Sequence, residues 1–297
     1  MNRYVPVGVG IVAAIIAITL ALQNAPIQEP ENIPQRYSYD ADFNDYVGEY
    51  FSKSSGGWTF VNSTSIFNTY VKEDEHVLVD GKKHYNQILL ELDPKINYEG
   101  ASVKNEPKKS VVIFPTFTAS AYTEPGFYTY YRNECGSECL TTQIRHDFLP
   151  QANPNAVQTL YLLGYSFVTD VDVDKDPSIL SNYDKVIVLH NEYVTKREFD
   201  AITKHPSVIY LYPNALYAEV EANYDKNTIT LVRGHNYPSA EIRNGFDWEF
   251  DNSVLEYNVD CKDMEFYRIN NGWMLNCYPE NIIHKSLNFL KIIKQLE

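Results

Sequence analysis

The sequence predicts an α/β protein with a doubly wound, mostly parallel sheet, added β-hairpins and an N-terminal transmembrane helix. Three observations lead to this prediction. Short, fully apolar runs rich in β-branched residues alternate with helical segments, two hairpin signals follow residue 214, and an uncharged apolar run opens the chain. With 297 residues and a 44% hydrophobic composition, the chain is long enough to bury a large core.

Residues 5–22 form the uncharged apolar run. As a helix they span about 27 Å, close to the ~30 Å core of a bilayer, so residues 1–22 are predicted to be a membrane anchor. Arg3 precedes the run, and Glu29 and Glu31 follow it, which favours a cytoplasmic N-terminus. A cleaved signal peptide is the alternative, but residues 20–23 (Leu-Ala-Leu-Gln) make a poor cleavage site. We therefore expect a single-pass protein of the cell membrane whose main domain is extracytoplasmic.

Three further regions follow the anchor. Residues 23–36 contain three prolines and are predicted to be an extended linker. Residues 37–109 read as a mixed, mainly β extension, with strands predicted at 58–61, 76–79 and 87–92. Residues 110–297 are predicted to form the α/β domain.

The α/β domain begins with a regular alternation of strands and helices. Gly164 and Pro206 mark helix ends, and Thr195 with Glu198 forms a capping box. Parallel strands joined by helices bind ligands at their carboxyl ends. The strands are predicted at 111–114, 165–171, 186–189 and 208–211, and the helices at 156–163 and 195–205.

After residue 214 the pattern changes to hairpins. Residues 218–224 and 228–232 form one predicted hairpin, and 265–269 and 273–277 form another, in which Asn271-Gly272 is a strong turn signal. A final amphipathic helix is predicted to pack on the sheet through one apolar stripe, made of Ile283, Leu287, Leu290 and Ile293.

Charge and cysteine content limit the class of protein. The net charge of −14 without a Lys/Arg cluster excludes a nucleic-acid-binding surface. The four cysteines form two local pairs, Cys135 with Cys139 and Cys261 with Cys277, which are predicted to be structural disulfides. A zinc site is the less favoured reading, because the pairs lie far apart and lack CxxC spacing. Asn62 begins the one N-glycosylation sequon.

Polar side chains follow three predicted buried strands, at residues 116–122, 169–174 and 190–193. Carboxyl ends of parallel strands meet at one edge, so these three segments predict a site there. The alternating Asp170, Asp172, Asp174 and Asp176 resemble a calcium loop only weakly. Because the glycine and distal glutamate of that pattern are absent, a strand end with its aspartates on one face is the favoured reading.

The stretches TFTASAY, TDVDVDKDPSILSNYDKVIVLHNEYVT and YLYPNALY resemble the core of the N,N-dimethylformamidase large-subunit family, over roughly residues 110–220. The shared features are an Ala-Tyr after the first strand, an Asp-x-Asp segment, a His-x-Glu-Tyr motif and an Asn-containing Tyr segment. The resemblance implies a fold like that of class I glutamine amidotransferases and a metal-dependent hydrolase that acts on a small amide.

Family members hold an iron ion with two tyrosines and one glutamate. Tyr122 matches the first tyrosine and Glu192 matches the glutamate. The second tyrosine has no evident match; the corresponding stretch offers His146 or Asp147 instead, so the alternatives to iron are another hard metal ion or no metal at all. By the same resemblance Glu192 and His190 are the expected catalytic residues. The expected pocket residues are Asn214, Asp170 and Asp172.

Plainer roles remain open for the same residues. Tyr122 could be a half-buried wall, Glu192 could favour a helix dipole, and His190 could be a core histidine. No cysteine or serine nucleophile elbow and no glycine-rich phosphate loop is evident. The competing class is therefore a non-catalytic cell-surface binding protein that keeps the fold without the chemistry.

The predicted topology can be tested with an alkaline phosphatase reporter fused to the C-terminus. Because the anchor should export everything after residue 22, the reporter should be active, since this enzyme needs an oxidising compartment. A fusion protein without phosphatase activity would indicate that the main domain stays in the cytoplasm, which reverses the predicted orientation.

Overall fold

The structure is a computed structural model that describes residues 56–61, 66–79, 81–85, 88–106, 109–146 and 153–296. The predicted anchor (1–22), the linker (23–36), Asn62 and Asp147 lie outside the described residues. Within the described part of the chain, no helix is long and apolar enough to cross a membrane.

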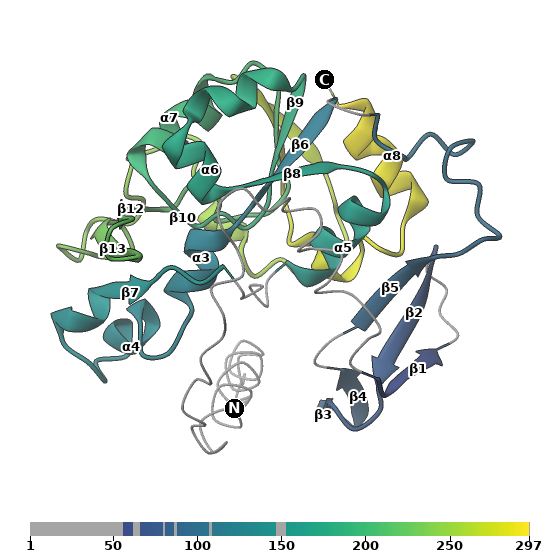
Figure 1. The fold of residues 1–297 in the computed structure, drawn as a ribbon, viewed down its shortest axis with the longest axis horizontal. Helices are drawn as coiled ribbons and strands as arrows, with labels where there is room; N and C mark the ends of the chain where they lie inside the picture. Colours follow the sequence, from purple (N-terminus) through teal and green to yellow (C-terminus); the bar gives the residue numbers. More distant parts are fainter. Residues whose placement is uncertain are drawn as a thin grey trace, which may run out of the picture.

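A six-stranded sheet forms the centre of a mixed α/β fold (Figure 1). The strand order is β14-β15-β11-β9-β6-β8; all neighbours are parallel except β14 and β15. The four predicted parallel strands are thus confirmed as neighbours in one sheet. The bounds are Ser110–Phe114 (β6), Ser166–Thr169 (β8), Lys185–Val188 (β9), Val208–Tyr210 (β11), Phe266–Ile269 (β14) and Gly272–Leu275 (β15).

The predicted hairpin at 265–277 forms, but it extends the central sheet rather than adding a separate unit. Its second strand pairs in parallel with β11, opposite Val208. A Cβ on Gly272 would lie only 1.8 Å from the carbonyl oxygen of Val208, so a residue without a side chain is required at this close approach.

Helices cover both faces of the central sheet (Figure 1). Alternate residues of β6, β9 and β11 point to opposite sides, and each side is apolar and buried. One face packs against α5 (Pro154–Leu162) and α8 (Leu287–Gln295), and the other packs against α6 (Asp170–Lys175) and α7 (Lys196–Lys204). The Thr195 hydroxyl caps α7 by accepting from the N–H of Glu198, but within the described residues the Glu198 carboxylate does not return a hydrogen bond, so only half of the predicted capping box forms. The Ser286 hydroxyl caps α8.

The aspartate run was expected to be a strand end, and this prediction was wrong. The strand β8 stops at Thr169, and residues 170–175 form α6. Thr169 and Asp172 make a reciprocal capping box, with the backbone N–H of Thr169 2.8 Å from the Asp172 carboxylate. Carboxylates in the first turn also favour the helix dipole, so the same residues that suggested an acidic strand start a helix instead.

A second sheet lies next to the carboxyl ends of the central strands, with the order β10-β12-β13-β7. Its β12 and β13 are antiparallel, as predicted for residues 218–232. Two short helices, α3 and α4, connect β6 to this sheet (Figure 1). The bounds are Thr116–Ala121 (α3), Phe127–Tyr131 (α4), Thr141–Gln143 (β7), Tyr193–Val194 (β10), Ala218–Asn223 (β12) and Thr228–Arg233 (β13).

The N-terminal extension packs against α5. Its three-stranded sheet has the order β1-β2-β5, and Gln158 of α5 bonds to its edge, accepting from the N–H of Leu90 and donating to the carbonyl of Ile88. The predicted strands of this region are confirmed. The bounds are Trp58–Val61 (β1), Phe67–Lys72 (β2), His76–Val79 (β3), Lys82–Tyr85 (β4) and Ile88–Leu92 (β5).

Both predicted disulfides are present, Cys135–Cys139 and Cys261–Cys277. The second bridge ties the segment before β14 to the end of β15. The short 3₁₀ turns complete the fold; they span Ser137–Leu140 (η2), Pro177–Asn182 (η3), Ser253–Leu255 (η4) and Pro279–Asn281 (η5).

Glu280 should make the stability of the fold depend on pH. Its carboxylate accepts from the hydroxyl of Tyr212 at 2.5 Å and the N–H of Asn155 at 2.6 Å, yet burial raises its pKa to about 8. Between about pH 4.5 and pH 8 the native state therefore keeps a proton on Glu280, whereas the unfolded chain, in which this pKa has its ordinary value of 4.5, releases it.

We predict that Glu280→Gln flattens the pH dependence of the free energy of unfolding. The stability that the protonated group contributes is complete below about pH 4.5 and is lost as the pH rises through about 8. Each unit of pKa difference corresponds to about 1.4 kcal/mol. Urea unfolding at intervals from pH 4.5 to 8 should show a smaller decline in the variant; parallel curves for both proteins would contradict this.

Candidate active site

The candidate site lies where the strand order of the central sheet reverses. β6 has β8 on one side and β9 on the other, although the chain visits β8 before β9. The segments that follow β6 and β9 therefore run in opposite directions, and this leaves a crevice at the carboxyl ends of the two strands. The chain that leaves β6 reaches Tyr122 after one short helix, and the chain that leaves β9 reaches His190 and Glu192 directly.

Glu192 is the centre of the site. Its side chain is fully buried, and its carboxylate accepts a hydrogen bond from the Tyr122 hydroxyl at 2.8 Å. The Tyr128 hydroxyl donates to the Tyr122 oxygen at 2.9 Å and lies 3.4 and 3.5 Å from the two carboxylate oxygens. The Nε2 atom of His235 contacts the carboxylate as well. Two phenols and an imidazole thus converge on one buried carboxylate.

Burial and charge act in opposite directions on these groups. Burial alone would raise the pKa of Glu192, but the charge and hydrogen bond of His235 outweigh it and the pKa is lowered. Burial and then the negative charge of Glu192 raise the pKa of Tyr122 and of Tyr128 well above 10. Burial and the same charge raise the pKa of Glu256 to about 7. The site is therefore an anionic centre surrounded by protonated phenols.

His190 and Asn214 have buried polar atoms without a hydrogen-bond partner among the described residues. His190 is 2% exposed, and neither ring nitrogen has a hydrogen-bond partner; its Nε2 lies 3.9 Å from a Glu192 oxygen. Burial lowers the pKa of His190, so the ring is held neutral. Asn214 follows β11, and its buried side-chain oxygen has no partner. The side-chain oxygen of Asn153 accepts a hydrogen bond from the N–H of His190, but its amide nitrogen has no partner among the described residues. Unpaired buried groups of this kind are costly, so these atoms are available to bind a water or a ligand.

Backbone hydrogen bonds hold Glu192 in place. Its carbonyl accepts from the N–H of Ala218, the first residue of β12, and from the N–H of Tyr217 just before it. On the other side, the N–H of Tyr193 donates to the hydroxyl of Thr118 in α3. Glu192 therefore lies directly before β10 and is bonded to the start of β12; it is not at the start of a helix, as the plainer reading of the sequence assumed.

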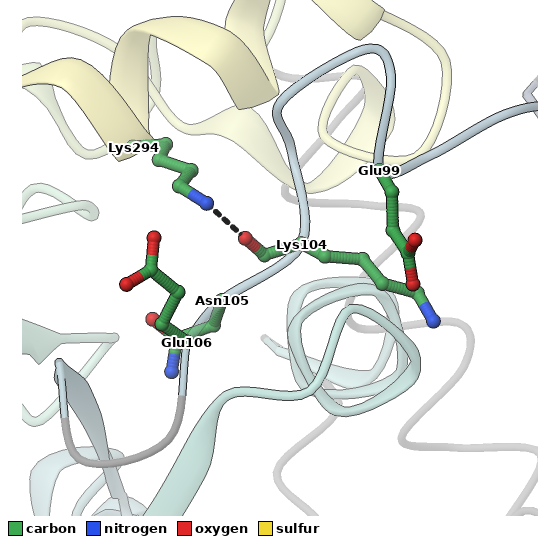
Figure 2. A pocket seen from close by; sticks show the side chains of 5 residues that line it. All are labelled: Glu99, Lys104, Asn105, Glu106 and Lys294. Atoms are coloured by element: carbon green, nitrogen blue, oxygen red, sulfur yellow. Dashed lines mark hydrogen bonds between the residues drawn. The ribbon is translucent and has the colours of Figure 1, made fainter.

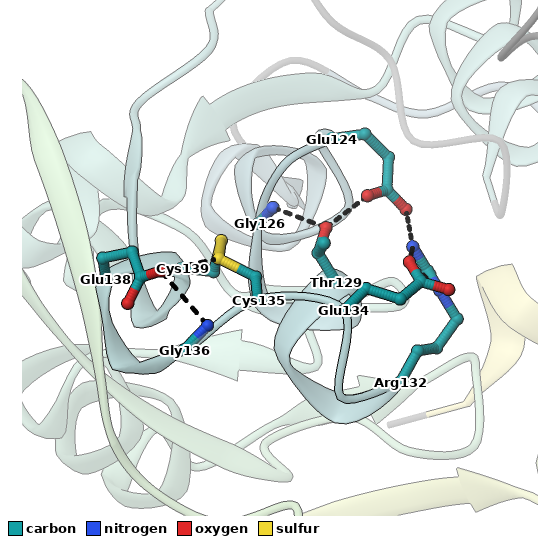
Figure 3. Close-up of a disulfide and its surroundings, with 9 residues drawn as sticks. All are labelled: Glu124, Gly126, Thr129, Arg132, Glu134, Cys135, Gly136, Glu138 and Cys139. Carbon is teal, nitrogen blue, oxygen red and sulfur yellow. Dashed lines mark hydrogen bonds and ion pairs between the residues drawn. A yellow bond between two sulfur atoms is a disulfide. The ribbon is translucent and has the colours of Figure 1, made fainter.

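The second phenol, Tyr128, lies on α4, and ion pairs and a disulfide brace this helix (Figure 3). Arg132 pairs with Glu124 at 2.8 Å on one side and with Glu134 at 3.0 Å on the other. The Cys135–Cys139 bridge closes the chain immediately after the helix. These contacts fix the loop that brings Tyr128 to Glu192.

The predicted pocket aspartates have structural partners. Asp172 caps α6, as described above. Asp170 is fully buried and accepts from the N–H of Phe117 at 2.7 Å and the amide of Asn191 at 2.6 Å. Burial raises its pKa to about 7, and burial together with the charge of Asp170 raises the pKa of Glu198. Asp170 thus links β6 and β9 behind the site through Phe117 and Asn191.

The structure brings together Tyr122 and Glu192, which the resemblance assigned to the metal, and a third residue that the sequence analysis did not identify. Tyr122 donates a hydrogen bond to Glu192, and the hydroxyl of Tyr128 lies beside them. The groups that contact the Glu192 carboxylate include Tyr122, Tyr128 and His235, and Asp147 lies outside the described residues. Tyr128 lies six residues after Tyr122 in a tyrosine-rich segment, and that proximity was the available signal. His235 carried no sequence signal.

No protein-family model matches this chain, and no curated protein sequence matches it. In the described part of the chain, no three His, Cys, Asp or Glu side chains form a group that could hold a metal ion. The Glu192 cluster differs in composition, because two of its donors are phenols. A hollow is lined by Glu99, Lys104, Asn105, Glu106 and Lys294 (Figure 2). Asn105 bonds to Ser110 at the start of β6, and Lys185 at the start of β9 bonds to Lys294, so this hollow lies near the amino ends of these strands.

The disulfide beside α4 should control local order at the site. We predict that replacing Cys135 and Cys139 together by serine increases amide hydrogen exchange over residues 124–140, because the bridge closes this loop. The loss of global stability should be about 2 kcal/mol or less, since the loop is short. The matched control replaces Cys261 and Cys277, which should leave exchange over 124–140 unchanged; equal effects would contradict a local role.

Proposed function

We propose that this chain is a metal-dependent hydrolase of a small amide, and that Tyr122, Tyr128 and Glu192 hold the metal ion. The observation that carries the proposal is the convergence of two phenol oxygens on one fully buried carboxylate. This pair of tyrosines with a glutamate is the donor set that the resemblance to the N,N-dimethylformamidase family implies.

The donor chemistry fits a hard ion such as Fe³⁺. Phenolate and carboxylate oxygens prefer hard cations, and two phenolates with one carboxylate carry three negative charges. In the absence of an ion, the phenols keep their protons because burial and Glu192 raise their pKa values. A bound cation reverses this effect and favours the phenolate forms.

The neighbouring residues have roles that follow from their own chemistry. When bound, the ion supplies Lewis acidity that polarises an amide carbonyl and activates water. The neutral imidazole of His190 can donate a hydrogen bond to a substrate oxygen, since neither nitrogen is otherwise engaged. The free amide oxygen of Asn214 can accept one from a substrate N–H. A small ligand would then satisfy buried groups that lack partners.

The remaining finer expectations belong to this proposal. We infer that the fold is of the class I glutamine-amidotransferase type, which the strand order of the parallel strands supports. We also infer that residues 5–22 anchor the chain in the cell membrane with its main domain outside. The two disulfides support an oxidising compartment, since such bridges are rare in the cytosol.

A non-catalytic binding protein of the cell surface is the second candidate. It is favoured by the hydrogen bonds that already satisfy Glu192, which would keep the cluster stable without an ion. In that case the phenols and the carboxylate would be a structural network inherited without the chemistry.

Metal analysis of the full-length chain, purified in detergent without chelators, separates the two candidates. We predict about one tightly bound ion per chain, and a loss of that ion in Glu192→Gln. Tyr128→Phe should weaken metal affinity by about 10- to 100-fold and lower hydrolysis of simple formamides and acetamides in parallel. Glu280→Gln is the matched control, because it makes the same change in another buried carboxyl, and it should keep the ion. A metal-free chain that is indifferent to Glu192→Gln would favour the binding protein.

A further inference from the structure

His235 contacts the Glu192 carboxylate from a different element and on a different oxygen than Tyr122. Tyr122 donates to Oε2, whereas the Nε2 atom of His235 lies against Oε1. Tyr122 and Tyr128 come from the segment after β6, and His235 follows β13 of the second sheet. The carboxylate is therefore approached from two sides, by oxygen donors on one and by a nitrogen donor on the other.

The backbone at His235 adopts a conformation that its side chain does not favour. Residues 234–237 form a tight turn closed by two hydrogen bonds between Gly234 and Tyr237, each 2.9 Å long. The φ angles of His235 and Asn236 are 53° and 63°, the pattern of a type I′ turn. Glycine or asparagine is the usual residue there, so a histidine costs conformational energy. Strain of this kind is a reason to look for function.

Aromatic rings fix the orientation of the His235 side chain. The imidazole stacks on Tyr131, with ring centroids 4.8 Å apart, and on Tyr193, with centroids 5.7 Å apart and only 6° between the planes. Tyr217 meets it edge-on at 4.9 Å. The backbone is fixed too, because the N–H of His235 bonds to the carbonyl of Arg243 at 2.9 Å. The nitrogen that faces Glu192 is thus held in one direction.

We propose that His235 is a fourth ligand of the ion that Glu192, Tyr122 and Tyr128 hold, an inference that rests on the proposed function. Two phenolates and a carboxylate balance the charge of a ferric ion, so a further ligand should be neutral. Imidazole is a neutral donor that suits iron, and its Nε2 faces the same carboxylate as the phenols. The site then has three oxygen donors and one nitrogen donor.

His190 is the competing nitrogen donor, and its position is less suitable. Its Nε2 is 3.9 Å from Glu192, and it makes no hydrogen bond there. Its ring packs among Tyr122, Tyr212 and Tyr278, with centroids 6.4, 6.4 and 5.8 Å away. His235 is in direct contact with the carboxylate, and its side chain is 23% exposed.

The test uses the full-length protein loaded with ferric nitrilotriacetate, with the tyrosinate-to-iron absorption band as the readout. His235→Gly removes the imidazole and suits a φ of 53°, so the fold should be retained, which circular dichroism checks. We expect the variant to bind ferric ion about tenfold or more weakly. Free imidazole should restore the affinity by entering the vacated aromatic site. His76→Gly on β3 is the control and should bind as the unaltered protein does.

Pulsed electron paramagnetic resonance identifies the nitrogen ligand directly. The ferric protein should show coupling to a histidine nitrogen that disappears in His235→Gly and returns, at the ¹⁵N frequency, with ¹⁵N-imidazole. Coupling that persists in His235→Gly and disappears in His190→Gln would assign the nitrogen to His190 and overturn the inference while the proposed function stands. A chain that develops no tyrosinate band with ferric ion would reject both.

Discussion

The arrangement of the site depends on one buried carboxylate. Glu192 has no exposed surface, and an isolated charge in that position would cost several kcal/mol. Every element around it contributes to offsetting that cost: α3 and α4 through the two phenols, and the turn after β13 through His235. The carboxylate explains why segments distant in sequence meet here, and why the tyrosine hydroxyls remain protonated.

The fold makes this convergence possible. The reversal of strand order around β6 opens the edge where Tyr122 and Glu192 meet, and the second sheet closes that edge from the other side. The hydrogen bonds of Asp170 to Phe117 and Asn191 fasten the two strand ends to each other. The disulfide and the Arg132 ion pairs hold the loop of Tyr128. The site is thus built from residues on loops, and hydrogen bonds, ion pairs and a disulfide hold these loops in position.

Much of the fold could be predicted from sequence, because local chemistry determined it. The apolar runs of β6, β9 and β11, the cap at Thr195 and the hairpin of β12 and β13 all carry their signals within a few residues. The prediction for residues 170–176 was wrong. The alternation of Asp with other residues suggested a strand end, whereas the capping box of Thr169 starts a helix. The parallel pairing of β15 with β11 joins distant segments and left no local trace.

The site was predictable only in part, for the same reason. Glu192 closely follows one predicted strand, and Tyr122 ends the short segment that follows another, so topology placed them together. Tyr128 depends on the path of the braced loop, and His235 on a turn of the second sheet, and neither path can be read from residue spacing. Long-range packing therefore decides which tyrosine of 24 and which histidine of seven reach the carboxylate.

The central claim is that the oxygens around Glu192 form a cation site. Crystals soaked with ferric ion and measured at the iron absorption edge test it most directly, because the anomalous signal locates the ion without assumptions about activity. We predict one strong peak within coordination distance of the Tyr122 and Tyr128 hydroxyls and the Glu192 carboxylate. If the soaked crystals keep the Glu192 cluster intact but show no anomalous peak at these atoms, the account is contradicted.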